Sequence, residues 1–205
     1  MRETERGDPR ALVSAHFDRC NRAAEVFFAA EAARIAEACW AMARRFHQGG
    51  RILAFGNGAA ATDAQHVSVE FVHPVIVGKR ALPALALTND SAALSALHRD
   101  SSPQLGVAFA RQIVVLGRAA DMAIGFSPDG RCANVLQALD EARGMGMLTL
   151  ALAGGDGGQL AAADLDFCFV VPDHDPLVVQ ETHEMLYHVL WELVHVFFEH
   201  EGLLV

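Results

Sequence analysis

The chain has 205 residues, 52% of them apolar, and a formal net charge of −9 with neutral histidines. This length is sufficient for one domain with a full hydrophobic core. Because the balance is acidic and no stretch is rich in lysine or arginine, nucleic acid and membranes are poor candidates for direct partners.

Targeting signals and cysteine usage indicate the compartment. The start, MRETERGDPR, is charged and lacks the apolar core of a signal peptide. No apolar run approaches the ~20 residues of a membrane-spanning helix. The cysteines are scattered without paired spacing, which favours reduced thiols. They are Cys20, Cys39, Cys132 and Cys168. We therefore expect a cytoplasmic protein.

Residues 1–50 are predicted to be an N-terminal helical segment. Asp8 followed by Pro9 is a helix start, with a capping carboxylate and proline at the first helical position. Apolar residues then recur at helical spacing until Gly49 and Gly50, which indicate either two helices or one long bent helix. This is more apolar helix than a small domain can cover, so we expect the segment to mediate oligomerisation.

From residue 51 short apolar runs alternate with helical patterns. Such alternation predicts an α/β fold over residues 51–205, with a five-stranded parallel sheet between helical layers. The predicted strands are 51–55, 81–87, 121–127, 147–152 and 166–171, and the predicted helices include 60–72, 88–97, 131–143 and 175–200. Ligands in such sheets bind at the carboxyl ends of the strands.

The segment GNGAAATDAQHVSVEF follows the first predicted strand. Its two glycines permit a tight turn that brings backbone close to a ligand, although a purely structural turn is as good an interpretation. His66 and Glu70 are four residues apart and share one helix face. This pair suits a divalent metal, but the spacing alone also fits a plain surface hydrogen bond.

The last predicted helix, QETHEMLYHVLWELVH, carries many ionisable residues that are costly to bury unless paired. One interpretation is a solvated stripe, to which we assign His195 and His200. His183 and His188 fit it less well because apolar residues surround them. The glycine-rich loop 153–159, AGGDGGQ, could wrap a ligand or simply connect two elements.

These motifs occur together in one order and spacing: GNG…D-A-x-H-x3-E, LPALALTND, GFS-x2-G-x2-ANV, G-x-D-G-G and Q-E-x-H-x4-H. This combination of motifs resembles the sugar-isomerase (SIS) family. Within that family it is most similar to the branch that contains the phosphoheptose isomerases and the DnaA initiator-associating protein. The resemblance implies the SIS fold and an aldose–ketose isomerase that moves a proton between C1 and C2 of a sugar phosphate. It also implies a homotetramer with its sites at subunit interfaces.

The resemblance further implies one zinc ion per subunit, held by His66, Glu70, Gln180 and His188, with Glu70 and His188 also acting as the acid/base pair. The implied substrate contacts are Asn57, Gly58, Asp63, Asp90, Ser127, Arg131, Asn134 and Asp156. Gln180 and His188 lie ~12 Å apart along a helix. Glu184 or His183 could therefore be closer to the metal than the resemblance implies.

The phosphate-binding hydroxyls of the family are mostly missing here. The first turn reads Ala59-Ala60-Ala61, and in the third turn only Ser127 remains, with Pro128, Asp129 and Cys132 at the other hydroxyl positions. Arg131, Lys79 or Arg80 could compensate in part, or Arg131 could simply pair with Asp129. Pro74 replaces an arginine that is usual in the family. We therefore expect an altered sugar or sugar-phosphate substrate. The alternative is a non-catalytic SIS module that binds a carbohydrate derivative or a protein.

Overall fold

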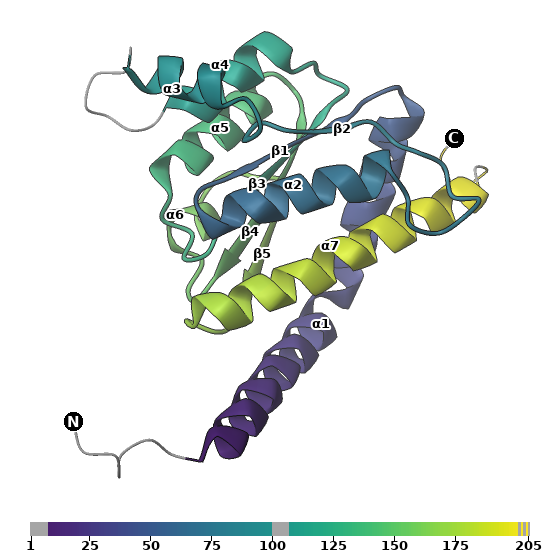
Figure 1. The fold of residues 1–205 in the computed structure, drawn as a ribbon. Helices are drawn as coiled ribbons and strands as arrows, with labels where there is room; N and C mark the ends of the chain where they lie inside the picture. The colour runs from purple at the N-terminus through teal and green to yellow at the C-terminus, as the bar shows by residue number, and fades with distance from the viewer. Residues whose placement is uncertain (1–7, 100–106, 201, 203, 205) are drawn as a thin grey trace.

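The computed structural model describes residues 8–99, 107–200, 202 and 204. Its elements alternate between helix and strand for most of the chain (Figure 1). They are α1 (Pro9–His47), β1 (Ile52–Gly56), α2 (Ala59–Val72), β2 (Ala84–Ala86), α3 (Ser91–Arg99), α4 (Val107–Leu116), β3 (Met122–Ser127), α5 (Ala133–Gly144), β4 (Leu148–Gly154), α6 (Gly158–Ala161), β5 (Phe167–Val171) and α7 (Pro176–Glu199).

The sheet has five parallel strands in the order β2-β1-β3-β4-β5. This confirms the predicted parallel sheet. Strands β1, β3 and β4 are buried at every residue, because helices cover both faces. The chain leaves β1 in one direction to form β2 and later returns to form β3 on its other side. The loops after β1 and β3 therefore flank a crevice at the carboxyl ends of the strands, where ligands bind in such sheets.

Two hydrophobic clusters fill the space on either side of the sheet. One joins the sheet to α1, α2 and α7, and the other joins it to α4, α5 and α6. Figure 1 shows α2 and α7 running side by side across one face. The layers are thus helix, sheet and helix, as the α/β prediction requires.

Residues 9–47 form one helix rather than two. Asp8 caps it by accepting a hydrogen bond from the Arg10 backbone amide at 3.0 Å. The second half packs against the sheet, whereas the first half projects beyond it (Figure 1). There Leu12, Val13 and Phe17 are 62%, 71% and 64% exposed. An oligomerisation role for this segment stays a prediction.

Helix α4 was not predicted from the sequence. Its inner face carries Phe109, Ala110 and Ile113, all of which are buried, at the spacing of a helix that covers a sheet. No helix among the described residues is long and apolar enough to cross a membrane. The cysteines are all free thiols.

Candidate active site

Helices α2 and α7 bring three candidate ligands together. His66 Nε2 lies 3.3 Å from Glu70 Oε1, and His188 Nε2 lies 3.9 Å from the same oxygen. One ligand atom from each residue lies within 4.8 Å of the other two. The predicted shared face of His66 and Glu70 therefore turns toward α7, and His188 completes a histidine, carboxylate and histidine set. This donor set fits zinc.

Two aromatic residues of α7 fix the orientation of this cluster. The Tyr187 hydroxyl lies 2.8 Å from His66 Nδ1, and Trp191 Nε1 donates to the Glu70 carbonyl oxygen at 2.9 Å. Burial raises the pKa of Tyr187, so its hydroxyl keeps its proton. Sequence reasoning missed both roles. The available signal was that buried tyrosine and tryptophan need a polar partner for their O–H or N–H.

Gln180 lies toward Asp63. Its Nε2 donates to Asp63 Oδ1 at 3.0 Å, and this contact stabilises a carboxylate that is only 6% exposed. Burial is the main influence on the pKa of Asp63 and raises it, while the hydrogen bond from Gln180 acts in the opposite direction. Gln180 thus connects α7 to the first turns of α2, and its role as a fourth metal ligand remains a prediction.

Other residues of α7 divide between the site and the core. Glu184 Oε1 lies 3.7 Å from His66 Nδ1, so Glu184 is at the edge of the cluster. His183 is buried and its Nε2 lies 3.0 Å from the Ala153 carbonyl oxygen, so its ring points away toward the sheet. Burial lowers the pKa of His183 to about 4. His183 is therefore a neutral core histidine.

His195 does not belong to a solvated stripe, and that assignment was wrong. The ring is 2% exposed, with Nδ1 2.7 Å from the Trp191 carbonyl oxygen and Nε2 2.9 Å from the Arg80 carbonyl oxygen. These contacts attach the segment before β2 to α7. His200, in contrast, is exposed.

The loops after β1 and β3 meet through two predicted substrate residues. Asn57 and Asn134 exchange two side-chain hydrogen bonds, each of 2.9 Å. Gly58 begins α2 with a φ of 59°. Asp90 lies farther along the same end of the sheet, where its Oδ1 accepts the Ala93 backbone amide at 2.9 Å. Asp90 is exposed and caps α3 in this structure.

In the loop after β3, several backbone amides donate hydrogen bonds to acceptors within the same loop. Ser127 is fully buried, and its Oγ accepts from the Cys132 backbone amide at 3.2 Å. The Gly130 amide donates to the Ser127 carbonyl oxygen at 3.0 Å, and the Arg131 amide donates to Asp129 Oδ1 at 2.9 Å. Three amides of the loop that precedes α5, where an α/β protein would bind a phosphate, therefore already have partners within the loop.

Arg131 joins the loops after β3 and β4. Its Nη2 lies 2.7 Å from Asp156 Oδ2, and its Nη1 donates to the Asp129 carbonyl oxygen at 2.9 Å. The guanidinium thus pairs with the Asp156 carboxylate rather than with the Asp129 carboxylate. The hydrogen bond from Arg131 lowers the pKa of Asp156. The Gly130 carbonyl oxygen also accepts the amides of Gln159 and Leu160, so the two loops form one unit.

Comparisons with known proteins agree with this architecture. Residues 15–154 match the model of the SIS domain. A phosphoheptose isomerase of Desulfovibrio desulfuricans is 41% identical over 182 residues, which cover 89% of this chain and 85% of the relative. The chain belongs to the phosphoheptose isomerase family of SIS-domain proteins.

Solved structures of the family superpose over most of the chain. A phosphoheptose isomerase from Neisseria gonorrhoeae matches with a TM-score of 0.83 and 34% identity, over 91% of this chain and 98% of that one. A phosphoheptose isomerase from Francisella tularensis matches with a TM-score of 0.85 and 28% identity, over 92% and 99%. The predicted family and SIS fold are thereby confirmed.

Proposed function

We propose that this member of the family is an aldose–ketose isomerase of sugar phosphates, as its relatives are named. The observation that supports this most is the convergence of His66, Glu70 and His188 between α2 and α7, which lie side by side on one face of the sheet. A proton acceptor and a proton donor lie there side by side, beside donors that suit a divalent metal.

In the proposed reaction, Glu70 moves the proton between the substrate carbons C1 and C2, and His188 exchanges the proton of the adjacent oxygen. Glu70 suits the first role because its side chain is 12% exposed, whereas His188 is 45% exposed and reaches the open side of the cluster. Zinc bound by His66, Glu70 and His188, with Gln180 as a fourth ligand, would polarise the substrate oxygen and stabilise enediolate charge. One zinc ion per subunit is the proposed stoichiometry of this cluster.

Tyr187 has a positioning role in this scheme. A histidine that binds a metal through Nε2 carries its proton on Nδ1. The Tyr187 oxygen, 2.8 Å from Nδ1, would accept that proton. The tyrosine thereby holds the ring of His66 in one orientation.

We propose that the substrate differs from that of hydroxyl-lined relatives at its phosphate end. Ser127 is turned inward, and the Asp129 carboxylate occupies the loop. A carboxylate ~5 Å from a phosphate charge adds about 3 kcal/mol of repulsion at an effective dielectric of ~20. The inward position of Ser127 and the Asp129 carboxylate also favour the second candidate, a non-catalytic module that binds a carbohydrate derivative or a protein.

The deciding experiment is an assay of aldose–ketose interconversion with sedoheptulose 7-phosphate and shorter ketose phosphates, together with metal analysis of the purified protein. We expect turnover, and a loss of about 10²–10⁴-fold in Glu70→Gln. Glu192→Gln is the matched control, because Glu192 is an exposed glutamate of α7. If the protein turned over none of these substrates and was stabilised by unphosphorylated ketoses, the isomerase proposal would be wrong. The second candidate, the binding module, would then be favoured.

The assembly we propose is a homotetramer with active sites at subunit interfaces. The support is the projecting half of α1, whose Leu12, Val13 and Phe17 are largely exposed, since large exposed apolar patches mark interaction sites. Light scattering coupled to gel filtration measures the mass directly. Phe17→Asp should lower it, and a monomeric wild type would disprove the assembly.

A further inference from the structure

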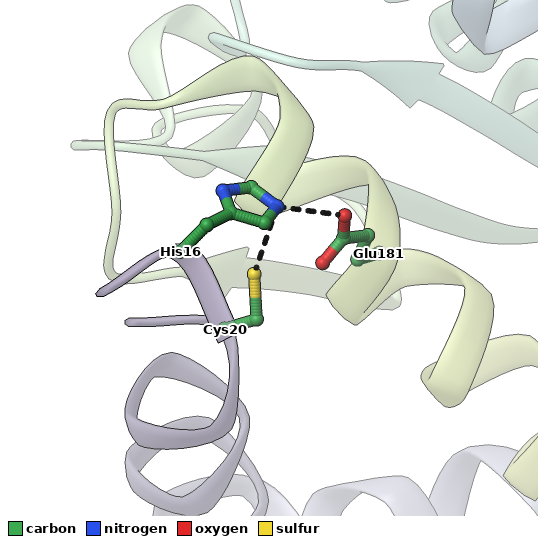
Figure 2. Close-up of side chains that lie close together, drawn as sticks. All are labelled: His16, Cys20 and Glu181. Carbon is green, nitrogen blue, oxygen red and sulfur yellow. Dashed lines mark hydrogen bonds and ion pairs between the residues drawn. The ribbon is translucent and has the colours of Figure 1, made fainter. Parts of the chain in front are cut away.

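A second group of ligand-type side chains lies away from the proposed active site, where α1 meets the first turns of α7. His16 and Cys20 occupy consecutive turns of α1 on the same face, and Glu181 faces them from α7 (Figure 2). One ligand atom from each lies within 4.8 Å of the other two. Among the residues that the structure describes, only this group and the His66 cluster converge in this way.

The three groups converge on one point. His16 Nε2 lies 3.1 Å from Glu181 Oε1 and 3.5 Å from Cys20 Sγ, and Figure 2 shows both contacts on the same ring nitrogen. In a catalytic triad the imidazole uses one nitrogen for the nucleophile and the other for the carboxylate. Because one nitrogen here faces both partners, the arrangement differs from a nucleophile that is activated by a base.

The separations are those of ligands around a small tetrahedral ion. Zinc bonds of ~2.0 Å to nitrogen or oxygen and ~2.3 Å to sulfur place neighbouring ligand atoms about 3.3–3.6 Å apart. The observed 3.1 Å and 3.5 Å lie close to this interval. We propose that His16, Cys20 and Glu181 form a second divalent-metal site, selective for zinc, that joins α1 to α7.

The chemistry of the donors supports zinc over magnesium or calcium. Thiolate and imidazole are ligands for zinc and related transition metals, whereas magnesium and calcium prefer oxygen. When the metal binds, the Cys20 thiol releases its proton to solvent and a metal–sulfur bond forms. Burial raises the pKa of Cys20 to about 11, so the metal competes with this proton and binds more tightly as the pH rises.

The surroundings leave a fourth coordination position. His16 and Glu181 are 44% and 47% exposed, whereas Cys20 is 7% exposed. A hollow of about 530 Å³ adjoins the site, lined by Leu12, Val13, His16, Phe17, Cys20 and Glu181. A water molecule or a side chain of a second copy has room to complete the coordination there.

The site occupies a junction that is already ordered. Arg19 Nη2 lies 2.6 Å from Asp173 Oδ1, and Arg19 Nη1 lies 3.1 Å from Asp175 Oδ2. These ion pairs hold α1 against the loop before α7, so the ligands need little rearrangement to bind. Glu181 directly follows Gln180 in α7, so a metal here would also fix the helix turn that carries Gln180.

Cobalt titration tests this site separately from the His66 cluster. Co²⁺ bound to a cysteine thiolate gives a near-ultraviolet charge-transfer absorption, and the His66 cluster contains no cysteine. In the wild type we expect a band whose amplitude corresponds to one thiolate-bound Co²⁺ per chain, in addition to any Co²⁺ that the His66 cluster takes up. The band should be absent in Cys20→Ala, and the affinity should fall at least tenfold in Glu181→Gln, which changes only an exposed side chain.

Two controls keep the result specific. Cys168→Ala removes a part-buried thiol elsewhere, and Glu70→Gln alters the other cluster; both should keep the band. Zinc should displace cobalt and abolish the band. A wild type without a thiolate band, or a band that persists in Cys20→Ala, would overturn the proposal, and neither result depends on isomerase activity.

Discussion

Asn57 and Asn134 lie face to face and exchange two side-chain hydrogen bonds of 2.9 Å across the crevice between β1 and β3. One residue follows β1 and the other begins α5, so this pair spans the point where the strand order reverses. Each amide uses one donor and one acceptor on its partner and keeps a second N–H and a second lone pair. The pair can therefore position the two loops and still contact a ligand.

Removing either amide of this pair should weaken ligand binding more than folding. In a double-mutant cycle of Asn57→Ala and Asn134→Ala, we expect a coupling free energy of unfolding of about 1 kcal/mol, because two neutral hydrogen bonds are partly exposed to water. KM should rise several-fold in each single variant. Urea unfolding and steady-state kinetics measure the two effects, and additive unfolding energies would show that the pair is not coupled.

The sheet was predictable because each strand is a short apolar run beside a turn and a helical pattern. The observed β1, Ile52–Gly56, differs from the predicted strand by one residue at each end. The ligand-bearing face of α2 was also predictable, since residues four apart share a helix face. These features depend on the spacing of residues that are close together in the chain, and this spacing can be read from the sequence itself.

The partners of those ligands were not predictable in the same way. The contacts of Tyr187 with His66 and of His195 with Arg80 connect residues more than 100 positions apart. The periodicity of apolar residues predicts on which face of a helix such a residue lies, but it does not predict which backbone carbonyl group lies opposite. His195 was assigned to solvent for this reason, although two carbonyl oxygens surround its ring.

Tyr187→Phe should impair the metal cluster without unfolding the protein. The ring would keep its edge contact with Phe126, whose centroid is 6.2 Å away, while the hydrogen bond to His66 is lost. Loss of such a supporting contact costs about 10–100-fold in metal affinity or activity. Competition with a chromophoric chelator and kcat measure this. Unchanged values for both would show that Tyr187 only packs.

Asp129→Asn should strengthen the binding of phosphorylated ligands. Asparagine keeps an oxygen that can accept the Arg131 amide, as Asp129 Oδ1 does at 2.9 Å, but removes the negative charge. Solvent screening reduces the gain at this exposed position, so we expect an improvement of about 3–10-fold. Titration with sedoheptulose 7-phosphate at low and high salt measures it.

The control for that change is Asp140→Asn, which alters the same charge on the exposed face of α5. If both variants improve binding equally, the effect comes from the overall charge of the protein rather than from the carboxylate in this loop. A decrease in affinity in Asp129→Asn alone would mean that the carboxylate itself contacts the ligand.

His183 should make folding stability depend on pH. Burial lowers its pKa to about 4 from an ordinary 6.5, so the folded state binds fewer protons than the unfolded state between these values. Its contribution is complete above pH 6.5 and is lost as the pH falls toward 4. We expect this residue to account for a decrease of about 2 kcal/mol in unfolding free energy between pH 8 and pH 5.

Urea unfolding of His183→Gln at the two pH values checks this expectation. Glutamine can donate to the Ala153 carbonyl oxygen but does not titrate in this range. The pH dependence should therefore become shallower by roughly 2 kcal/mol. His200→Gln, at an exposed histidine, should leave the dependence nearly unchanged, and an equal effect in both variants would exclude the role of burial.

Alanine substitutions at Gly130 and Gly58 distinguish the cost of steric contact from the cost of backbone strain. Both have positive φ angles, 69° and 59°. A Cβ atom at Gly130 would lie 1.9 Å from the Gly157 carbonyl oxygen, whereas a Cβ atom at Gly58 meets nothing within 4 Å. Gly58→Ala therefore incurs only the strain of an unfavourable backbone conformation, about 1–3 kcal/mol.

Gly130→Ala incurs a similar strain and must also push apart the loops after β3 and β4. We expect its unfolding free energy to fall further than that of Gly58→Ala, by at least another ~2 kcal/mol, because overpacking against fixed backbone is costly. It should also release the Gly130 carbonyl oxygen from the amides of Gln159 and Leu160. Parallel urea unfolding of the two variants measures the difference, and equal destabilisation would mean that the two loops separate at little cost.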